Sequence, residues 1–203
     1  GGTGSGDVHE AYSVTLPQGL ENAGYTTDKT LAQAYAEHIK AAKARRPETN
    51  PFLAPPPLPE LLPTVEQIDA AATANDASVI TIGRNSGEFI DRKAKDDFYL
   101  TEAEQTLIRN VSAAFHKAGK PVVVVLNIGG VIEVASWRDQ VDAILLAWQP
   151  GQEAGHAMAD VLSGKVNPSG KLTDTFALDL KDYPAAENFP GVTLLGPDPA
   201  ARG

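Results

Sequence analysis

Two kinds of apolar pattern alternate along this chain. Short, nearly continuous apolar runs over residues 77–83, 121–127 and 143–147 are typical of strands covered on both faces, and the second run is rich in β-branched side chains. Around these runs lie segments whose apolar positions recur every three or four residues, as they do in amphipathic helices. The helices predicted in this way span residues 12–23, 31–44, 64–75, 101–118 and 154–162.

This alternation predicts the fold class. Strands that alternate with helices form α/β folds, in which a mainly parallel sheet is covered by helices on both faces. We therefore expect a three-layer α/β/α sandwich, with the 12–23 and 31–44 helices packed on the sheet. Residues 45–63 contain seven prolines and are expected to run as an extended excursion on the surface.

Local signals mark several helix ends. Thr101 and Glu104 have the spacing of a capping box at the start of one helix. Thr64 is expected to cap the preceding helix. Gly164 stands where a left-handed residue would end the last helix.

The length and composition are those of one domain. With 203 residues and 42% hydrophobic content, the chain can bury one sizeable core. We expect a single domain over residues 1–190 and an irregular tail over residues 191–203. The glycine-rich residues 1–6 resemble a turn that follows a strand absent from this chain, so we expect a fragment or a processed piece.

Charge and cysteine content exclude several classes of partner. A formal net charge of -9 and a pI near 4.9 argue against nucleic acid or an anionic membrane, and no apolar run approaches the roughly 20 residues of a membrane-spanning helix. The absence of cysteine excludes disulfides, thiolate metal ligands and a cysteine nucleophile. It leaves the compartment open, and we expect a bacterial cytoplasm or periplasm. A neutral ligand such as a sugar fits this composition.

The best candidate site follows the 77–83 run. Residues 84–92 carry two carboxylates and two guanidinium groups at the carboxyl end of a predicted parallel strand, where ligand sites of α/β folds form. From residue type and position alone, Glu88 is either a catalytic carboxylate or a solvated loop residue. Asp91 and Arg92 are expected to order the loop.

Other residue types favour packing over chemistry. The histidines lack metal-ligand spacing, and Trp137 and Trp148 adjoin apolar strands, which favours core or domain-interface packing over sugar stacking. Residues 1–6 satisfy neither the Rossmann nor the P-loop pattern, so a nucleotide-binding domain is disfavoured. No serine lies in a G-x-S-x-G elbow. We expect no metal and no cofactor.

Several passages resemble one known family. They are S-G-E-F-I-D-R at residues 86–92, V-V-V-V-L-N-I-G-G-V-I-E-V-A-S-W at residues 122–137, and the P-G-Q-E to N-P-S-G-K-L passage within residues 148–172. Together they resemble the C-terminal α/β sandwich domain of glycoside hydrolase family 3, and the likeness covers nearly the whole chain. It implies about six strands, the first of which is missing from this chain. The residue pattern of 148–172 itself predicts a further strand after the last helix.

The resemblance also implies a function. Glu88 matches the general acid/base glutamate of β-glucosidases in that family, and Ser5 matches a segment that contacts the sugar. The partner would be an N-terminal TIM-like barrel domain that carries the nucleophilic aspartate. We therefore expect part of a retaining, exo-acting β-glucosidase-like enzyme acting on an oligosaccharide or β-glucoside, inert as this chain alone. The alternative is a non-catalytic carbohydrate-binding or interaction module of the same fold.

Overall fold

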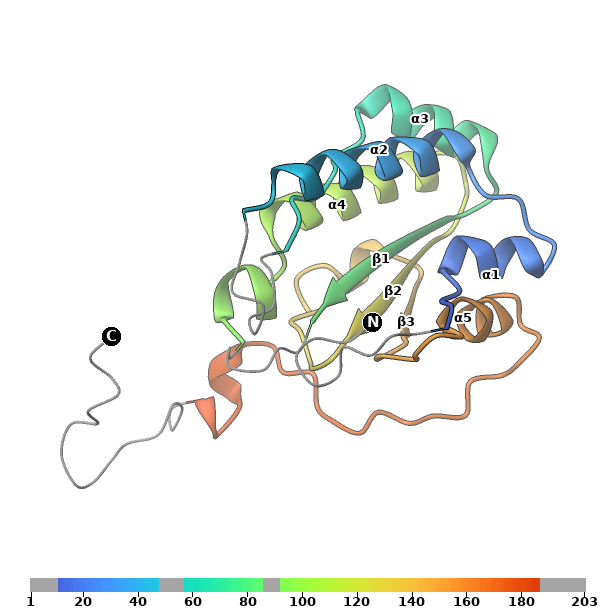
Figure 1. Ribbon diagram of the computed structural model, residues 1–203. Coiled ribbons are helices and arrows are strands. Elements are labelled where there is room, and N and C mark those ends of the chain that lie inside the picture. Colours follow the sequence, from blue (N-terminus) through green and yellow to red (C-terminus); the bar gives the residue numbers. More distant parts are fainter. Residues whose placement is uncertain (1–10, 48–56, 86–91, 187–203) are drawn as a thin grey trace, which may run out of the picture.

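The computed structural model describes residues 11–47, 57–85 and 92–186 as an α/β domain (Figure 1). Its three strands are parallel and lie in the order β1-β2-β3. Five α-helices accompany them. The elements are α1 (Leu16–Asn22), α2 (Lys29–Arg45), α3 (Val65–Ala74), β1 (Ser78–Arg84), α4 (Glu102–Lys117), β2 (Val122–Ile128), β3 (Ala143–Leu146) and α5 (Ala154–Leu162).

All three strands predicted from the apolar runs are present, each within two residues of its expected limits. In the register, Ile80 pairs with Val124, which in turn pairs with Ile144. The described residues contain three strands rather than the six that the resemblance implied. The prediction of a strand after the last helix was wrong, because residues 171–172 pair with no neighbouring strand. Leu172 is also 65% exposed, so it lacks the burial that favours a strand.

The main core lies between α3, α4 and one face of the sheet. Ile80 and Ile82 of β1 face this core together with Val124 and Leu126 of β2, and all four are buried. Each fully buried side chain of this kind stabilises the fold by roughly 1.5–3 kcal/mol. The helices contribute a matching stripe of buried residues: Ile68, Ala71, Ala72, Leu107, Ile108, Val111 and Phe115.

Helices α1 and α5 form a second layer on the other side of the sheet (Figure 1). They approach unusually closely where Gly19 meets Gly155. Two backbone hydrogen bonds join the segments there, from Val14 N to Gln152 O (2.8 Å) and from Gly155 N to Val14 O (2.9 Å). Glycine is therefore required at this helix crossing. With helices on both sides of the sheet (Figure 1), the sandwich expected from the alternating pattern is confirmed.

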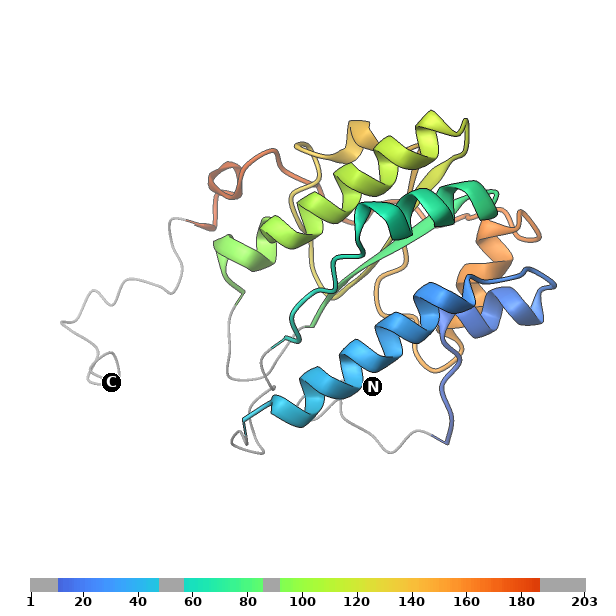
Figure 2. The same cartoon turned by 90° about the horizontal axis from the view of Figure 1, so that it is seen from above.

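Helix α2 lies beside α3 at the edge of the helical layer (Figure 2). We expected it to pack on the sheet, but none of its residues is fully buried, and Leu31 makes its contact with the core. Its half-buried face instead binds the proline-rich segment: Tyr35 Oη donates to Leu61 O (3.3 Å) and a His38 ring nitrogen contacts Pro59 O (2.7 Å). Within residues 11–47, 57–85 and 92–186, no helix is long and apolar enough to cross a membrane.

Candidate functional site

The candidate site lies where the carboxyl ends of the parallel strands meet. Arg84 ends β1, and Asn127 near the end of β2 donates from Nδ2 to the backbone oxygen of Trp148, which follows β3, at 2.5 Å. The segments at the ends of β2 and β3 are thus close together. Glu88 and Ser5, the residues predicted for catalysis and sugar binding, lie outside the described residues, as does Asp91.

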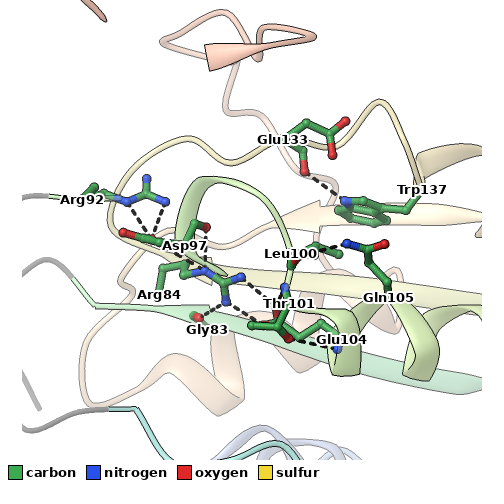
Figure 3. Close-up of polar contacts among 10 residues, drawn as sticks. All are labelled: Gly83, Arg84, Arg92, Asp97, Leu100, Thr101, Glu104, Gln105, Glu133 and Trp137. Carbon is green, nitrogen blue, oxygen red and sulfur yellow. Dashed lines mark hydrogen bonds and ion pairs between the residues drawn. The ribbon is translucent and has the colours of Figure 1, made fainter. Parts of the chain in front are cut away.

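A nearly buried ion pair anchors the first arginine of this region (Figure 3). The guanidinium of Arg84 donates to both carboxylate oxygens of Glu104, at 2.6 and 2.8 Å, and each side chain is only 10% exposed. Arg84 Nε also donates to the backbone oxygen of Asp97 (2.8 Å). Glu104 forms the predicted capping box with Thr101 at the start of α4. The end of β1 is therefore bound to the first turn of α4.

The same contacts set the ionisation of Glu104. Burial alone would raise the pKa of its carboxyl group. Hydrogen bonds from the Arg84 guanidinium and the backbone N–H of Thr101, together with the positive charge of Arg84, outweigh burial and hold the pKa below its usual value. Glu104 therefore remains ionised as the pH falls into the range where an exposed glutamate takes up a proton.

This lowered pKa predicts a specific acid sensitivity. At pH values between the lowered pKa of Glu104 in the folded protein and its usual pKa in the unfolded chain, the unfolded chain binds more protons at Glu104 than the folded chain does. The stabilisation is complete above the usual glutamate pKa and is lost as the pH falls through the lowered pKa of the folded protein. Urea-unfolding midpoints of the wild-type protein should fall between about pH 5 and pH 3. A Glu104→Gln variant should show a shallower fall, whereas Glu37→Gln, at an exposed position on α2, should leave the slope unchanged. Equal slopes for all three proteins would contradict this assignment.

A second ion pair anchors the arginine on the far side of the 86–91 segment. Arg92 Nε and Nη2 both donate to Asp97 Oδ1, at 3.0 and 2.7 Å, and Arg92 Nη1 donates to the backbone oxygen of Val131 (2.6 Å). Asp97 Oδ2 accepts from the backbone N–H of Lys93 (3.0 Å). Arg92 therefore joins the chain after β1 to the loop after β2. The loop that it was predicted to order, residues 86–91, lies outside the described residues.

A buried carboxylate organises the loop after β2. Glu133 is 4% exposed and accepts from the backbone N–H (2.6 Å) and the hydroxyl (2.7 Å) of Ser136. Its own N–H donates to Phe98 O (2.8 Å), and its backbone oxygen accepts from Trp137 Nε1 (2.9 Å). Trp137 is buried, which confirms the prediction of core packing. The sequence analysis did not identify Glu133. Its one sign in the sequence is that a single carboxylate stands among apolar residues in this turn.

Trp148 also packs against the core, as a partly buried side chain. Its ring lies against Phe176 with centroids 6.5 Å apart, and its backbone has a φ of 51°. A non-glycine residue in this conformation costs of order 1–3 kcal/mol and persists only when its surroundings hold it. The hydrogen bond from Asn127 to its carbonyl is one such constraint.

The histidines in the described part of the chain each contact a polar partner. His38 contacts Pro59 O, His116 contacts Asp142 (2.9 Å), and His156 lies between Glu153 (2.6 Å) and Asn22 (2.9 Å). Among the described residues, no group of three histidine, aspartate or glutamate side chains is placed to hold a metal ion.

Known proteins resemble this chain over almost its entire length. The family model described as glycosyl hydrolase family 3 C-terminal domain matches residues 1–197. Beta-glucosidase A of Butyrivibrio fibrisolvens is 40% identical over 93% of this chain, and a beta-glucosidase of Ruminococcus albus is 33% identical over 93% of it. The chain spans 25% and 20% of these two proteins, respectively.

A solved structure shares the fold. Beta-glucosidase 3B of Thermotoga neapolitana, determined in complex with glucose, superposes with a TM-score of 0.87 at 47% sequence identity. The superposition covers 94% of this chain and 27% of that protein. In each of these relatives, the matched region is about a quarter of a longer polypeptide.

Proposed function

We propose, from the premise that this chain belongs to the glycosyl hydrolase family 3 C-terminal domain family, that it supplies the general acid/base to a retaining, exo-acting β-glucosidase-like enzyme. The acid/base residue is Glu88. The nucleophile is an aspartate on an N-terminal TIM-like barrel domain of the same enzyme, and the substrate is an oligosaccharide or β-glucoside. The names of the two curated relatives and of the solved structure support this class of activity.

One observation carries the proposal. The S-G-E-F-I-D-R segment directly follows the carboxyl end of β1, a parallel strand, and this is where α/β folds place ligands. Both flanks of Glu88 are anchored, through Arg84 and Arg92. Each arginine already has a carboxylate partner, so its positive charge is compensated. This matters because an unpaired guanidinium nearby would favour the ionised form of the glutamate and weaken it as an acid.

The reaction proceeds in two balanced steps. In the first, Glu88 donates its proton to the glycosidic oxygen while the barrel aspartate attacks C1, the C1–O bond breaks, and the alcohol leaves. In the second, the Glu88 carboxylate takes a proton from water, the water oxygen attacks C1, and the aspartate is released. Two inversions at C1 give net retention, with carboxyl groups about 5 Å apart.

Ser5 contributes to substrate binding in this proposal, by a hydrogen bond to a sugar hydroxyl. Because such a contact is made in both the ground state and the transition state, its removal raises KM and leaves kcat nearly unchanged. A Ser5→Ala variant of the full-length enzyme should show this pattern in steady-state assays with an aryl β-glucoside. An unchanged KM would remove Ser5 from the site.

The test of the proposed function is hydrolysis of an aryl β-glucoside and an aryl β-xyloside. The chain is assayed alone and mixed with the N-terminal barrel domain from the same gene, beside the full-length enzyme. Activity is expected from the full-length enzyme and from the mixture, and nuclear magnetic resonance should show the β-anomer as the first product. Activity of the chain alone would overturn the divided mechanism. An inactive full-length enzyme would favour the non-catalytic binding module.

A further inference from the structure

We propose that Asp97 is a positioning residue for the acid/base glutamate, because it holds both arginines that flank the 86–91 segment. This inference rests on the proposed function of Glu88. Glu88 lies four residues after Arg84 and four residues before Arg92. Asp97 binds the first arginine through its backbone oxygen (2.8 Å) and the second through its carboxylate (2.7 and 3.0 Å). One residue therefore connects both ends of the segment that carries Glu88 (Figure 3).

Asp97 can act as an anchor because its own backbone is held firmly. It belongs to a wide turn, Ala94–Phe98, that is closed by hydrogen bonds from Phe98 N to Lys93 O (3.0 Å) and from Tyr99 N to Ala94 O (2.9 Å). Asp96 has a φ of 60°, a left-handed conformation that aspartate tolerates better than most residues. This conformation reverses the chain immediately before Asp97.

Aromatic packing fixes the turn to the rest of the domain. The Phe98 side chain is buried and makes edge-on contacts with the rings of Tyr99 (5.0 Å) and Tyr183 (6.1 Å). The Phe98 backbone oxygen accepts from Glu133 N in the loop after β2. A carboxylate on a turn supported in this way has little freedom to follow a moving arginine, so it restricts the arginine instead.

The position of the Arg92 guanidinium depends on two partners, Asp97 and the backbone oxygen of Val131. This guanidinium makes two hydrogen bonds to Asp97 and one to Val131 O, a planar arrangement that a lysine cannot reproduce. The backbone of Gly130 lies so close that a Cβ there would be 3.0 Å from Arg92 Nη1. Arg92 is therefore confined on two sides, by Asp97 and by the loop after β2.

The experiment replaces Asp97 in the full-length enzyme and measures how strongly the resulting change in kcat/KM depends on the leaving group of the substrate. A misplaced acid mainly slows substrates whose leaving group needs a proton, whereas 2,4-dinitrophenolate leaves without one. For Asp97→Ala we expect kcat/KM to fall about 10- to 100-fold with a 4-methoxyphenyl β-glucoside and less than about 3-fold with the 2,4-dinitrophenyl β-glucoside. Asp97→Asn, which keeps an acceptor oxygen, and Arg92→Lys should show the same dependence to a smaller extent.

The matched control is Asp160→Asn. Asp160 is also paired with a cation, Lys165 at 2.9 Å, and its side chain is 32% exposed compared with 25% for Asp97, but it lies on α5. This variant should leave kcat/KM unchanged with both substrates. If Asp97→Ala does not fold, as judged from its thermal unfolding midpoint, Asp97→Asn and Arg92→Lys provide the result.

Two outcomes would overturn the inference, and they are distinguished by a parallel Glu88→Gln variant. If Glu88→Gln shows the leaving-group dependence but the Asp97 and Arg92 variants lose activity equally with both substrates, or not at all, Asp97 is merely structural. If Glu88→Gln itself lacks the dependence, the proposed function fails and the inference fails with it.

Discussion

A Glu88→Gln variant of the full-length enzyme is expected to lose about 10²–10⁴-fold in kcat/KM on a disaccharide or another substrate with a poor leaving group. Glutamine has nearly the same shape as glutamate but cannot donate a proton to the departing oxygen. The ground-state contacts survive, so KM should change little in comparison with kcat. Steady-state kinetics on cellobiose and on 2,4-dinitrophenyl β-glucoside measure the effect, which should be far smaller for the second substrate.

A Glu88→Ala variant adds a chemical test of the second step. Without its base, the glycosyl-enzyme intermediate is hydrolysed slowly, and a small anion such as azide can attack C1 directly and leave as the β-glycosyl azide. Added azide should therefore accelerate turnover of the dinitrophenyl substrate. Glu37→Gln, which removes an exposed carboxylate on α2, should retain full activity. Full activity of Glu88→Gln on the disaccharide would rule out the assignment.

A Gly155→Ala substitution is expected to destabilise the protein by about 2–4 kcal/mol. Helix propensity alone would predict the opposite sign, because alanine is favoured over glycine inside a helix. An added Cβ would lie 2.1 Å from Thr15 O and 2.7 Å from Val14 O. Both obstacles are backbone atoms, so α1 and α5 would have to separate, and the hydrogen bond from Gly155 N to Val14 O would weaken. The midpoint of urea unfolding should fall accordingly.

The control for this prediction is Gly170→Ala. Gly170 has no atom within 4 Å of the position of an added Cβ, so the same chemical change should shift stability by less than about 0.5 kcal/mol. Gly19→Ala provides an independent check, because its Cβ would lie 2.0 Å from Gly155 O. If Gly155→Ala raises the unfolding midpoint, as helix propensity alone would predict, α1 and α5 do not cross as closely as described.

The sequence-based predictions were most accurate where a signal is local. The capping box of Thr101 and Glu104 is present, as is the cap at Thr64, and Gly164 has the predicted left-handed conformation, with a φ of 73°. The first helix begins at Leu16 rather than at residue 12, because Thr15 caps it and Pro17 occupies its first turn. That boundary could have been predicted from these two residues.

The predictions failed where stability depends on a distant partner. A strand requires a neighbour for its backbone groups, and residues 171–172 have none in the described part of the sheet. Helix α2 has an apolar stripe of the expected spacing, but its tyrosine and histidine carry polar groups that bind the backbone of residues 59–61. Periodicity identifies the half-buried face of a helix and does not identify what covers it.

Residue types within a few positions of one another were sufficient to predict the three strands of the described sheet, the helix caps, the family resemblance and the choice of Glu88. The contact between Gly19 and Gly155 and the two roles of Asp97 could be found only from the folded protein. Folding also joins Arg92 to Val131, 39 residues further along the chain. These contacts arise from how the sheet and helices pack, and packing brings together residues whose local sequence carries no sign of the partner.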